Sequence, residues 1–359
     1  MRVAVDCRYT RIERHDGISR FTASLTAALA RRLGPEDELV MLVSDERQLT
    51  MLPELPHAVI SSPTSAREPF VALQVNRLAP DVVFSPMQTM GAFGRRYPLA
   101  LTVHDLIYYT HRTPPRDLPA PVRLLWRLYH LAWWPQRLLL NRADAVVTVS
   151  DTTRALIARH RLTRRPVTVV PNAADAVPAR ERTRPDGVEL VYMGSFMPYK
   201  GVDTLVAALH HLPGARLHLL SRIPAGERDR LTAAAPAGSL VVHDGVDDAE
   251  YEALLDRATA LVHASREEGF GIPLVEAMGR GTPIVVADTA IFREIGGETA
   301  LYFPVDDAEG LAAAVRRLTQ PGEWERRSAA GPTEAARFDW DASAAALETL
   351  LRTLAATRR

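Results

Sequence analysis

Short apolar runs alternate with longer helical patterns along this chain, and the alternation restricts the fold more than any other feature. In the first half, runs rich in Val, Ile and Leu occur at 3–7, 39–44, 82–86, 99–105 and 145–150. In the second half, comparable runs occur at 190–195, 215–221, 239–245, 260–265 and 282–288. Continuous apolar runs of this length are typical of strands buried on both faces of a parallel sheet. The pattern therefore predicts an α/β fold with two doubly wound, Rossmann-like domains.

The alternation stops over residues 167–187, where the chain is dense in Pro, Arg and Asp, as linkers are. A chain of 359 residues also exceeds the ~100–200 residues of a usual domain. We predict a first domain at 1–176, a linker at 177–187, a second domain at 188–338 and a C-terminal helix at 339–359, with packing back on the first domain as one option. Ligands of open α/β sheets bind beyond the carboxyl ends of the strands, so we expect the site in a cleft between the domains.

Charge is balanced over the whole chain but divided between its halves. Lys+Arg and Asp+Glu both number 43, yet residues 1–180 carry a net charge of +8 and residues 181–359 a net charge of −8. The basic half predicts contact with something anionic, such as a phospholipid surface or a phosphorylated acceptor; a solvated Arg-rich face is the simpler alternative. We expect no nucleic-acid partner.

The single cysteine and the N-terminus indicate where the protein works. Cys7 cannot form an intrachain disulfide, which fits a reducing cytoplasm. The N-terminus has no apolar core with a cleavage site, and no window reaches the ~18 apolar residues that span a bilayer. We expect a cytoplasmic protein, either soluble or peripheral on the inner face of the plasma membrane.

One position departs from a strong preference for arginine. Lys200 is the only lysine among the 43 basic residues. On a solvated face arginine replaces lysine with little effect, whereas a compact ammonium acting as a point charge on phosphate is not interchangeable with a planar guanidinium. Lys200 is therefore a candidate phosphate ligand.

Two glutamates eight positions apart, Glu268 and Glu276, flank a Gly-Phe-Gly turn that opens a helix pattern near Pro273. This places Glu268 in the loop before the helix and Glu276 in its first turns. Carboxylates there can accept paired hydrogen bonds from sugar hydroxyls, and backbone N–H groups of the loop can line an anion site. Those N–H groups belong to Gly269, Phe270, Gly271 and Ile272. The alternative is that both acids only complement the helix dipole.

The segment EGFGIPLVEAMGRGTPIV at 268–285 resembles the nucleotide-sugar signature of the family 4 glycosyltransferases, and the likeness extends over nearly the whole chain. It implies the GT-B architecture and retaining transfer of a sugar from a donor on the C-terminal half to an acceptor on the N-terminal half. In that family the first glutamate, here Glu268, binds the donor sugar hydroxyls, and the second, here Glu276, binds the ribose. Neither is an acid or base, but Glu268 lies at the reacting sugar and is, with His104, a catalytic candidate.

The resemblance includes Lys200, which matches the family's lysine on the donor diphosphate. Many members carry an arginine five residues earlier or immediately before it, where this chain has Ser195 and Tyr199. Ser195 is thus expected in the donor site, with one phosphate-binding charge fewer than usual. Arg222 and Arg266 are candidates to replace that charge, and an ordinary surface position is the simpler interpretation of each.

Gly17 lies at the first strand-to-helix crossover, in RHDGISRF, which resembles the family's glycine-rich first loop. A residue without Cβ lets the backbone approach a phosphate and directs helix N–H groups at it. Ser19 stands where a second glycine is common, and Arg20 matches the family pattern. We expect Gly17 at the donor phosphate. Arg20 is expected either near the acceptor or in contact with the residues that form the site.

His104 and Asp105 end an apolar run, where sites form in such sheets. A strand histidine is more often a core residue, but VHDLIYY resembles the family's HD segment, whose histidine contacts the donor and helps to organise the transition state. Asp105 is expected to fix the tautomer of His104 or to meet the acceptor. Asn172, in VVPNAAD, resembles a family segment at the domain junction with Ala173 replacing the usual glycine, and we interpret it first as an Asx-turn residue.

Residues 121–142 combine aromatic and basic side chains at helical spacing. The aromatic members are Trp126, Tyr129, Trp133 and Trp134, and the basic members are Arg123, Arg127, Arg137 and Arg142. Burial in the core is the simpler interpretation. The alternative is an amphipathic surface that contacts a membrane and presents a lipid-linked acceptor.

The resemblance leads to a specific prediction, a retaining hexosyltransferase that needs no metal and no cofactor beyond its nucleotide-sugar donor. The overall pattern is similar to bacterial mannosyltransferases and favours GDP-mannose, with UDP-glucose and UDP-N-acetylglucosamine open. The acceptor is a glycan, a lipid-linked molecule or a small molecule. Two other functions stay open: a nucleotide-sugar 2-epimerase of the same architecture, and a catalytically silent sugar-nucleotide-binding protein.

Overall fold

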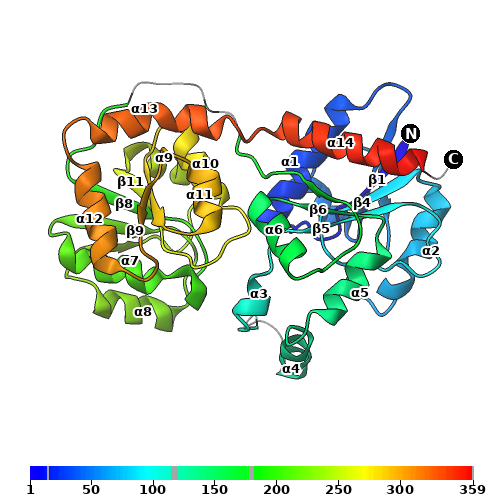
Figure 1. Ribbon diagram of the computed structural model, residues 1–359, viewed down its shortest axis with the longest axis horizontal. Helices are drawn as coiled ribbons and strands as arrows, with labels where there is room; N and C mark the ends of the chain where they lie inside the picture. The colour runs from blue at the N-terminus through cyan, green and yellow to red at the C-terminus, as the bar shows by residue number, and fades with distance from the viewer. Residues whose placement is uncertain (14–15, 115–119, 176, 178–181, 358–359) are drawn as a thin grey trace. The chain divides into compact units, whose positions relative to one another are not determined.

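The computed structural model describes residues 1–13, 16–114, 120–175, 177 and 182–357, and the chain divides into two compact units (Figure 1). Unit 1 comprises Met1–Ala173 together with Asp339–Arg359, and unit 2 comprises Ala174–Phe338. Each unit contains one fully parallel sheet with helices around it. The predicted α/β class with two doubly wound units is confirmed.

Unit 1 is built on a seven-stranded sheet in the order β3-β2-β1-β4-β5-β6-β7. Its strands are β1 (Arg2–Asp6), β2 (Glu38–Val43), β3 (His57–Val59), β4 (Val82–Ser85), β5 (Leu99–Val103), β6 (Ala145–Thr148) and β7 (Val167–Val169). The five expected strands are present and almost entirely buried. The edge strands β3 and β7 are additions, and β7 corrects the linker-like interpretation of residues 167–169. Both have three partly exposed residues, so they lack the apolar run that marks a central strand.

Helices cover the sheet of unit 1. They are α1 (Gly17–Arg32), α2 (Val71–Val75), α3 (Ile107–Thr110), α4 (Ala120–Tyr129), α5 (Trp134–Arg142), α6 (Asp151–Arg159) and α14 (Trp340–Ala356), with short 3-10 turns η1 (Glu46–Met51), η2 (Glu68–Phe70) and η3 (Asn76–Leu78). The last helix, α14, lies beside α1 (Figure 1), where Arg31 Nη2 donates to Asp341 Oδ1 (2.7 Å). The C-terminal helix thus belongs to the first unit. No described helix is both long and apolar enough to cross a bilayer.

Unit 2 is built on a six-stranded sheet in the order β10-β9-β8-β11-β12-β13. Its strands are β8 (Val188–Tyr192), β9 (Ala215–Leu219), β10 (Leu240–Val242), β11 (Ala260–His263), β12 (Ile284–Ala287) and β13 (Leu301–Phe303). Its helices are η4 (Pro198–Lys200), α7 (Val202–Ala208), η5 (Leu209–His211), α8 (Ala225–Ala234), α9 (Asp248–Arg257), α10 (Ile272–Gly279), α11 (Ala290–Gly296), α12 (Ala308–Leu318) and α13 (Glu323–Ala335). The edge strand β13 is the one strand of this unit that no apolar run predicts.

The predicted linker is partly anchored on unit 2. Residues 178–181 lie outside the described part of the chain, but Arg182 donates to Thr282 Oγ1 (2.6 Å) and lies over the ring of Trp324 at 5.4 Å. These contacts attach the C-terminal part of the segment to the second sheet's helices.

Both sheets change strand order beside their first strand. In unit 1, β1 lies between β2 and β4, and in unit 2, β8 lies between β9 and β11. Ligands of doubly wound sheets bind beyond the carboxyl ends of the strands at this position. In unit 2 the loop after β8, 193–197, leads to Lys200, and the loop after β11, 264–271, contains Glu268.

Candidate functional site

The loops that follow β8 and β11 approach each other closely. The N–H group of Arg266 donates to the carbonyl of Tyr199 (2.8 Å). Gly201 has a φ of +66°, and a Cβ on it would lie 2.3 Å from the carbonyl oxygen of Ala264. Glycine therefore permits both the left-handed turn and the close approach. The result is that the side chain of Lys200 reaches the second loop.

Lys200 and Glu268 form an ion pair that is largely shielded from solvent. Lys200 Nζ donates to Glu268 Oε1 (2.6 Å), and the two side chains are 13% and 11% exposed. Burial alone would raise the pKa of the Glu268 carboxyl, but the Lys200 ammonium outweighs burial and holds that pKa below its ordinary value. Glu268 therefore stays ionised and keeps its capacity to accept hydrogen bonds.

His263, the last residue of β11, joins this cluster without having been predicted. Its Nε2 lies 3.7 Å from Glu268 Oε1, and its ring packs edge-on against Tyr192 and Phe292. Burial lowers the pKa of His263 to about 4, so the ring is neutral near pH 7. Its Nδ1 is buried without a hydrogen-bond partner among the described residues. A histidine that closes an apolar run is the same sequence feature that selects His104, so His263 could have been found.

Glu276 lies in α10, and a tyrosine from α9 contacts it. Tyr251 Oη donates to Glu276 Oε2 over 2.9 Å, and Tyr251 is buried. The contact orients the carboxylate and ties α9 to α10. No sequence feature distinguishes Tyr251 from any other apolar residue of an amphipathic helix, so only the structure reveals it.

The segment between the two glutamates turns sharply into α10. Gly271 has a φ of +107°, and Phe270 is buried with its ring edge-on to Phe338. The backbone N–H groups of residues 269–272 donate to no other described residue. They are therefore available to an anion or to another hydrogen-bond acceptor of a ligand, as the sequence predicts.

The other residues considered for the donor diphosphate lie farther toward the surface. Ser195 is exposed, and its carbonyl accepts a hydrogen bond from Tyr192 Oη (2.7 Å). Arg266 pairs with Asp306 (2.9 Å) and donates to the carbonyl of Pro198 (3.1 Å). Arg266 is thus engaged in surface contacts, which favours the simpler interpretation of it.

In unit 1, Gly17 is the first residue of α1, but a capping carboxylate occupies part of the expected anion site. Asp16 accepts hydrogen bonds from the N–H and the hydroxyl of Ser19 (both 2.8 Å) and pairs with Arg11 (2.5 Å). Burial would raise the pKa of Asp16, but the Ser19 and Arg11 contacts lower it. The N–H group of Ser19 is therefore used within the protein. The expectation that Gly17 lies at the donor phosphate stays a prediction. A Cβ on Gly17 would meet nothing within 4 Å, and Arg20 lies half-buried in the same turn.

His104 follows β5 and is held by a backbone carbonyl. Its Nε2 donates to the carbonyl of Pro86 (2.7 Å), and its ring packs edge-on against Phe21. A carbonyl only accepts, so the proton is on Nε2; burial lowers the pKa of His104 and keeps it neutral, with Nδ1 as an acceptor. The expectation that Asp105 fixes this tautomer is wrong. Asp105 Oδ1 instead accepts from the N–H of Ile107 (3.1 Å) at the start of α3.

Asn172 lies in unit 1 after β7 and is buried. Its Oδ1 has no hydrogen-bond partner among the described residues, so it forms no Asx turn there, and that interpretation is wrong. The neighbouring Pro171 carbonyl accepts from Ser343 Oγ (2.8 Å) on α14. Asn172 therefore lies at the packing contact of the C-terminal helix.

Helices α4 and α5 have a packed aromatic side and an exposed aliphatic side. The ring of Trp126 meets that of Tyr108 edge-on (4.9 Å), and Trp133 stacks on Tyr109 (3.9 Å). The exposed apolar side chains are each between 43% and 65% accessible, and they are Val122, Leu124, Leu125, Leu128, Leu131, Trp134 and Leu138. Core packing thus holds for most of the aromatic rings, whereas the exposed leucines leave the membrane contact as a prediction.

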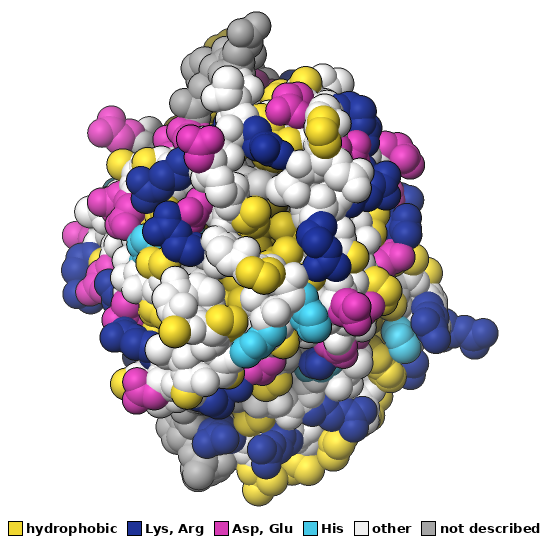
Figure 2. Space-filling view, turned by 90° about the vertical axis from the view of Figure 1, so that its left-hand side faces the viewer, with side chains coloured by type: hydrophobic (Ala, Val, Ile, Leu, Met, Phe, Trp, Pro, Cys, Tyr) yellow, Lys and Arg dark blue, Asp and Glu magenta, His cyan; other side chains and the backbone are white. Residues whose placement is uncertain are grey.

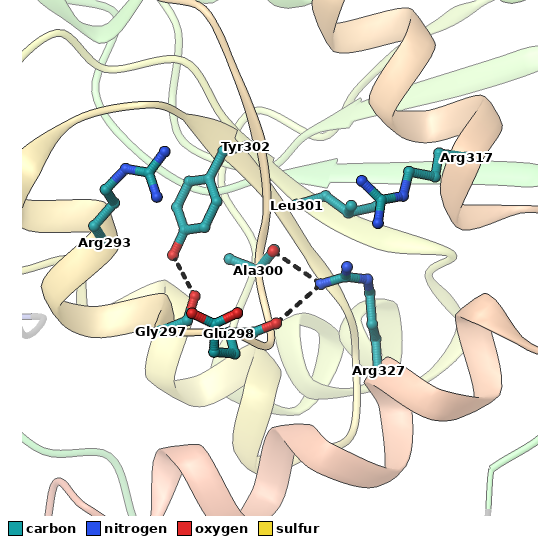
Figure 3. A pocket seen from close by; sticks show the side chains of 8 residues that line it. All are labelled: Arg293, Gly297, Glu298, Ala300, Leu301, Tyr302, Arg317 and Arg327. Atoms are coloured by element: carbon teal, nitrogen blue, oxygen red, sulfur yellow. Dashed lines mark hydrogen bonds between the residues drawn. The ribbon is translucent and has the colours of Figure 1, made fainter.

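A cavity of about 260 Å³ in unit 2 is lined by none of the predicted residues (Figure 3). Its cations are already engaged: Arg293 pairs with Asp288, and Arg327 pairs with Glu323. Arg327 Nη1 also donates to the carbonyl of Ala300 (2.8 Å). These arginines stabilise the chain between α11 and β13, and the cavity is not a candidate for the donor site.

Charges are mixed over the face of the molecule that Figure 2 shows. Basic and acidic side chains are interspersed there, and neither sign forms a single patch.

Two sequence-family models match the chain. "Glycosyltransferase Family 4" matches residues 15–177, and "Glycosyl transferases group 1" matches residues 187–320. The first match covers most of unit 1, and the second covers Lys200, Glu268 and Glu276 in unit 2.

Curated relatives with sequence similarity include enzymes that act on several sugars. The glycogen synthase of Mycobacterium tuberculosis is 35% identical over 198 residues, which are 50% of this chain and 47% of the relative. The MMP alpha-(1->4)-mannosyltransferase of Mycolicibacterium hassiacum is 29% identical over 69% of this chain and 64% of the relative. The phosphatidyl-myo-inositol mannosyltransferase of Mycolicibacterium smegmatis is 30% identical over 52% of this chain and 51% of the relative. The chain thus spans between about half and two thirds of the length of these relatives.

Solved structures show the same fold. Sucrose-phosphate synthase from Thermosynechococcus elongatus superposes with a TM-score of 0.75 at 20% identity, covering 99% of both chains. HepE of Anabaena, in complex with UDP and glucose, superposes with a TM-score of 0.72 at 18% identity, covering 99% of this chain and 100% of HepE. WaaG, a glycosyltransferase involved in lipopolysaccharide biosynthesis, superposes with a TM-score of 0.69 at 15% identity, covering 97% of this chain and 99% of WaaG. The predicted GT-B architecture is thereby confirmed.

Proposed function

Because this chain belongs to glycosyltransferase family 4, we propose that it transfers a hexosyl residue from a nucleotide sugar to an acceptor hydroxyl, with retention at the anomeric carbon. The observation that carries the proposal is the Lys200–Glu268 pair at the carboxyl ends of β8 and β11, with Glu276 on the helix that follows. Shielded charges of both signs at this position of a doubly wound sheet suit a sugar diphosphate, which offers anionic and hydroxyl groups together.

The donor is held by groups of three kinds. Lys200 and the N–H groups of residues 269–272 meet the diphosphate, as an ammonium and oriented backbone donors do. Glu268 accepts hydrogen bonds from the donor sugar, and Glu276, oriented by Tyr251, accepts those of the ribose. The ammonium and the N–H groups also stabilise the charge that develops on the departing diphosphate.

Transfer with retention takes place on one face of the sugar. The acceptor oxygen bonds to the anomeric carbon as the bond from that carbon to the phosphate oxygen breaks, through an oxocarbenium-like state. The acceptor proton passes to the leaving phosphate oxygen, so no protein nucleophile is required. His104, neutral and with Nδ1 as an acceptor, contacts the transferred sugar and helps to organise this state.

GDP-mannose is the favoured donor, because several relatives are named mannosyltransferases. UDP-linked sugars are the alternative, since HepE was solved with UDP and glucose. We propose that no metal takes part. Within the described ranges, no group of three or more His, Cys, Asp or Glu side chains is placed to hold one.

A thermal-shift and hydrolysis screen tests the donor site. GDP, UDP, ADP and their common sugar conjugates are added, with EDTA present, to the full chain, to Glu276→Ala and to the control Glu309→Ala, which alters an exposed residue of α12. We expect one nucleotide to stabilise the wild type and the control but not Glu276→Ala, and its sugar conjugate to be consumed. Binding without turnover would favour the silent binding protein, and no stabilisation by any nucleotide would contradict the proposal.

We also propose that α4 and α5 contact an anionic membrane surface. Their exposed leucines lie on the same helices as Arg123, Arg127 and Arg137, the pattern of an interfacial helix that meets both acyl chains and anionic headgroups. The inner side of α4 packs on residues next to His104, since Trp126 contacts Tyr108. A lipid-linked acceptor fits this arrangement.

Flotation with vesicles tests this contact. The wild type is expected to float with phosphatidylglycerol-containing vesicles and much less with pure phosphatidylcholine. Leu124→Ser/Leu125→Ser/Leu128→Ser should stay in solution, whereas the control Val59→Ser, an exposed valine at the sheet edge, should float normally. Equal flotation of all three proteins would contradict the membrane contact.

A further inference from the structure

Helix α5 carries a side-chain amide, Gln136, into the interior of unit 1. Gln136 is fully buried, and Leu140, four positions later, is buried on the same face of the helix. Leu140 belongs to one core cluster with Val103 and Leu106. His104 lies between these two residues in the sequence. The inner face of α5 therefore packs against the segment that carries His104.

Both polar atoms of the Gln136 amide are hydrogen-bonded. Tyr129 Oη, from the last residue of α4, donates to Gln136 Oε1 (2.9 Å), and Gln136 Nε2 donates to Gln88 Oε1 (2.8 Å). A buried amide costs free energy unless its atoms have hydrogen-bond partners. These two bonds offset that cost and give the side chain one direction, toward the loop that follows β4 (residues 86–90).

The loop after β4 is also the segment that holds His104. The carbonyl of Pro86 accepts a hydrogen bond from His104 Nε2 (2.7 Å). The next carbonyl, that of Met87, accepts from the backbone N–H of Thr102 on β5 (3.1 Å). Gln88 follows directly, and its side chain is the part of the loop that α5 contacts. Two residues of backbone thus separate the contact with α5 from the contact with His104.

The position of the Pro86 carbonyl decides how the His104 ring is presented. A carbonyl only accepts, so this contact places the imidazole proton on Nε2 and leaves Nδ1 as an acceptor. Hydrogen bonds weaken steeply as their atoms move out of line. A small shift of the loop therefore removes the restraint, after which either ring nitrogen can carry the proton.

We infer that Gln136 is a positioning residue for His104. By holding Gln88, it fixes the loop whose Pro86 carbonyl sets the tautomer and the direction of the imidazole. The inference rests on the proposed glycosyl transfer, in which His104 contacts the transferred sugar. It gives Gln136 no contact with the donor or the acceptor, and it requires Gln136 and Gln88 to act as one unit.

NMR of the full chain labelled with ¹⁵N-histidine tests the inference, because protonated and unprotonated ring nitrogens differ in chemical shift. The His104 signals are assigned with His104→Gln. The variants are Gln136→Leu, Gln88→Leu and the two combined. The control is Asn141→Leu, which removes another amide of α5, one that accepts from the N–H of Arg164 (2.9 Å) instead of meeting the loop.

We expect one His104 tautomer, with the proton on Nε2, in the wild type and in Asn141→Leu. Gln136→Leu and Gln88→Leu should each show a mixture of tautomers. The combined variant should be no more affected than either single one, because all three lose the same contact. For hydrolysis of the sugar conjugate found in the donor screen, kcat should fall about fivefold, the effect of one hydrogen bond, with KM unchanged.

An unchanged tautomer in both single variants would overturn the inference, as would additive effects in the combined variant or a change in KM alone. If Gln136→Leu does not fold, Gln88→Leu decides the matter, since it alters a half-buried loop residue and leaves α5 intact. A wild type that consumes no sugar conjugate would reject the proposed transfer, and the tautomer of His104 would then decide the positioning role by itself.

Discussion

Lys200 Nζ lies 2.6 Å from Glu268 Oε1, which joins the only lysine of the chain to the first glutamate of the spaced pair. The two residues are 68 positions apart and follow different strands of one sheet. Each supplies the counter-charge of the other. We therefore expect this contact to affect both the stability of unit 2 and the donor affinity that we propose.

Replacing Lys200 with methionine should separate these two effects. Lys200→Met leaves a buried carboxylate without a counter-charge, and we expect the free energy of unfolding to fall by about 3 kcal/mol. In Lys200→Met/Glu268→Leu no charge remains buried, so most of that stability should return, while nucleoside diphosphate binding stays lost. Urea denaturation and calorimetric titration measure the two quantities. Equal destabilisation of the single and double variants would contradict this account.

His263 should make stability depend on pH. Its pKa is about 4 in the folded state and near 6.5 when unfolded, so the unfolded chain takes up the proton first as the pH falls. Stability should be unaffected above pH 6.5, fall by up to about 3 kcal/mol between pH 6.5 and 4, and then level off. Denaturation curves across this range should be flatter for His263→Gln than for the wild type. Parallel curves would show that His263 does not contribute.

Tyr251 should affect nucleotide affinity without affecting the fold. Tyr251→Phe removes the hydrogen bond to Glu276 and keeps the ring, so we expect the Kd of the nucleoside diphosphate to rise about fivefold, as for one hydrogen bond. Tyr302→Phe, which loses contacts to the backbone of Gly297 and Phe292 in the same unit, is the matched control. An unchanged Kd in Tyr251→Phe would show that the hydrogen bond from Tyr251 does not orient Glu276 for nucleotide binding.

Gly201 should be far less tolerant of alanine than another left-handed glycine. Gly201→Ala adds a Cβ that would lie 2.3 Å from the Ala264 carbonyl, whereas Gly214→Ala adds one in open space at a φ of +81°. The control should lose about 1 kcal/mol from backbone strain alone. Gly201→Ala should lose more and should also weaken nucleotide binding, because the loops that carry Lys200 and Glu268 must separate. Equal losses of the free energy of unfolding in Gly201→Ala and Gly214→Ala, measured by denaturation, would contradict this prediction.

Much of the fold could be predicted because central parallel strands have a distinct sequence pattern. The apolar runs at 82–86 and 260–265 contain β4 and β11. The three-residue strands β3, β7 and β13 are not predicted, and β3 and β7 bury less of their surface than the central strands do. Their presence depends on a neighbouring strand that offers hydrogen bonds.

The candidate site was predictable to the level of its loops and individual motifs. Residues 268–276 and Lys200 carry patterns that chemistry explains, whereas Tyr251 carries none. Its place beside the candidate site comes from its contact with Glu276, which lies 25 positions away and is brought close by the fold.

The sequence by itself determined the α/β class, the central strands and the loops that hold Glu268 and His104, because burial and turn geometry act on neighbouring residues. Only the tertiary structure decided that Lys200 pairs with Glu268, that Pro86 rather than Asp105 sets the tautomer of His104, and that the leucines of α4 face outward. These outcomes depend on strand order and on packing between distant segments. A contact of this kind exists only after the sheet has brought its partners together.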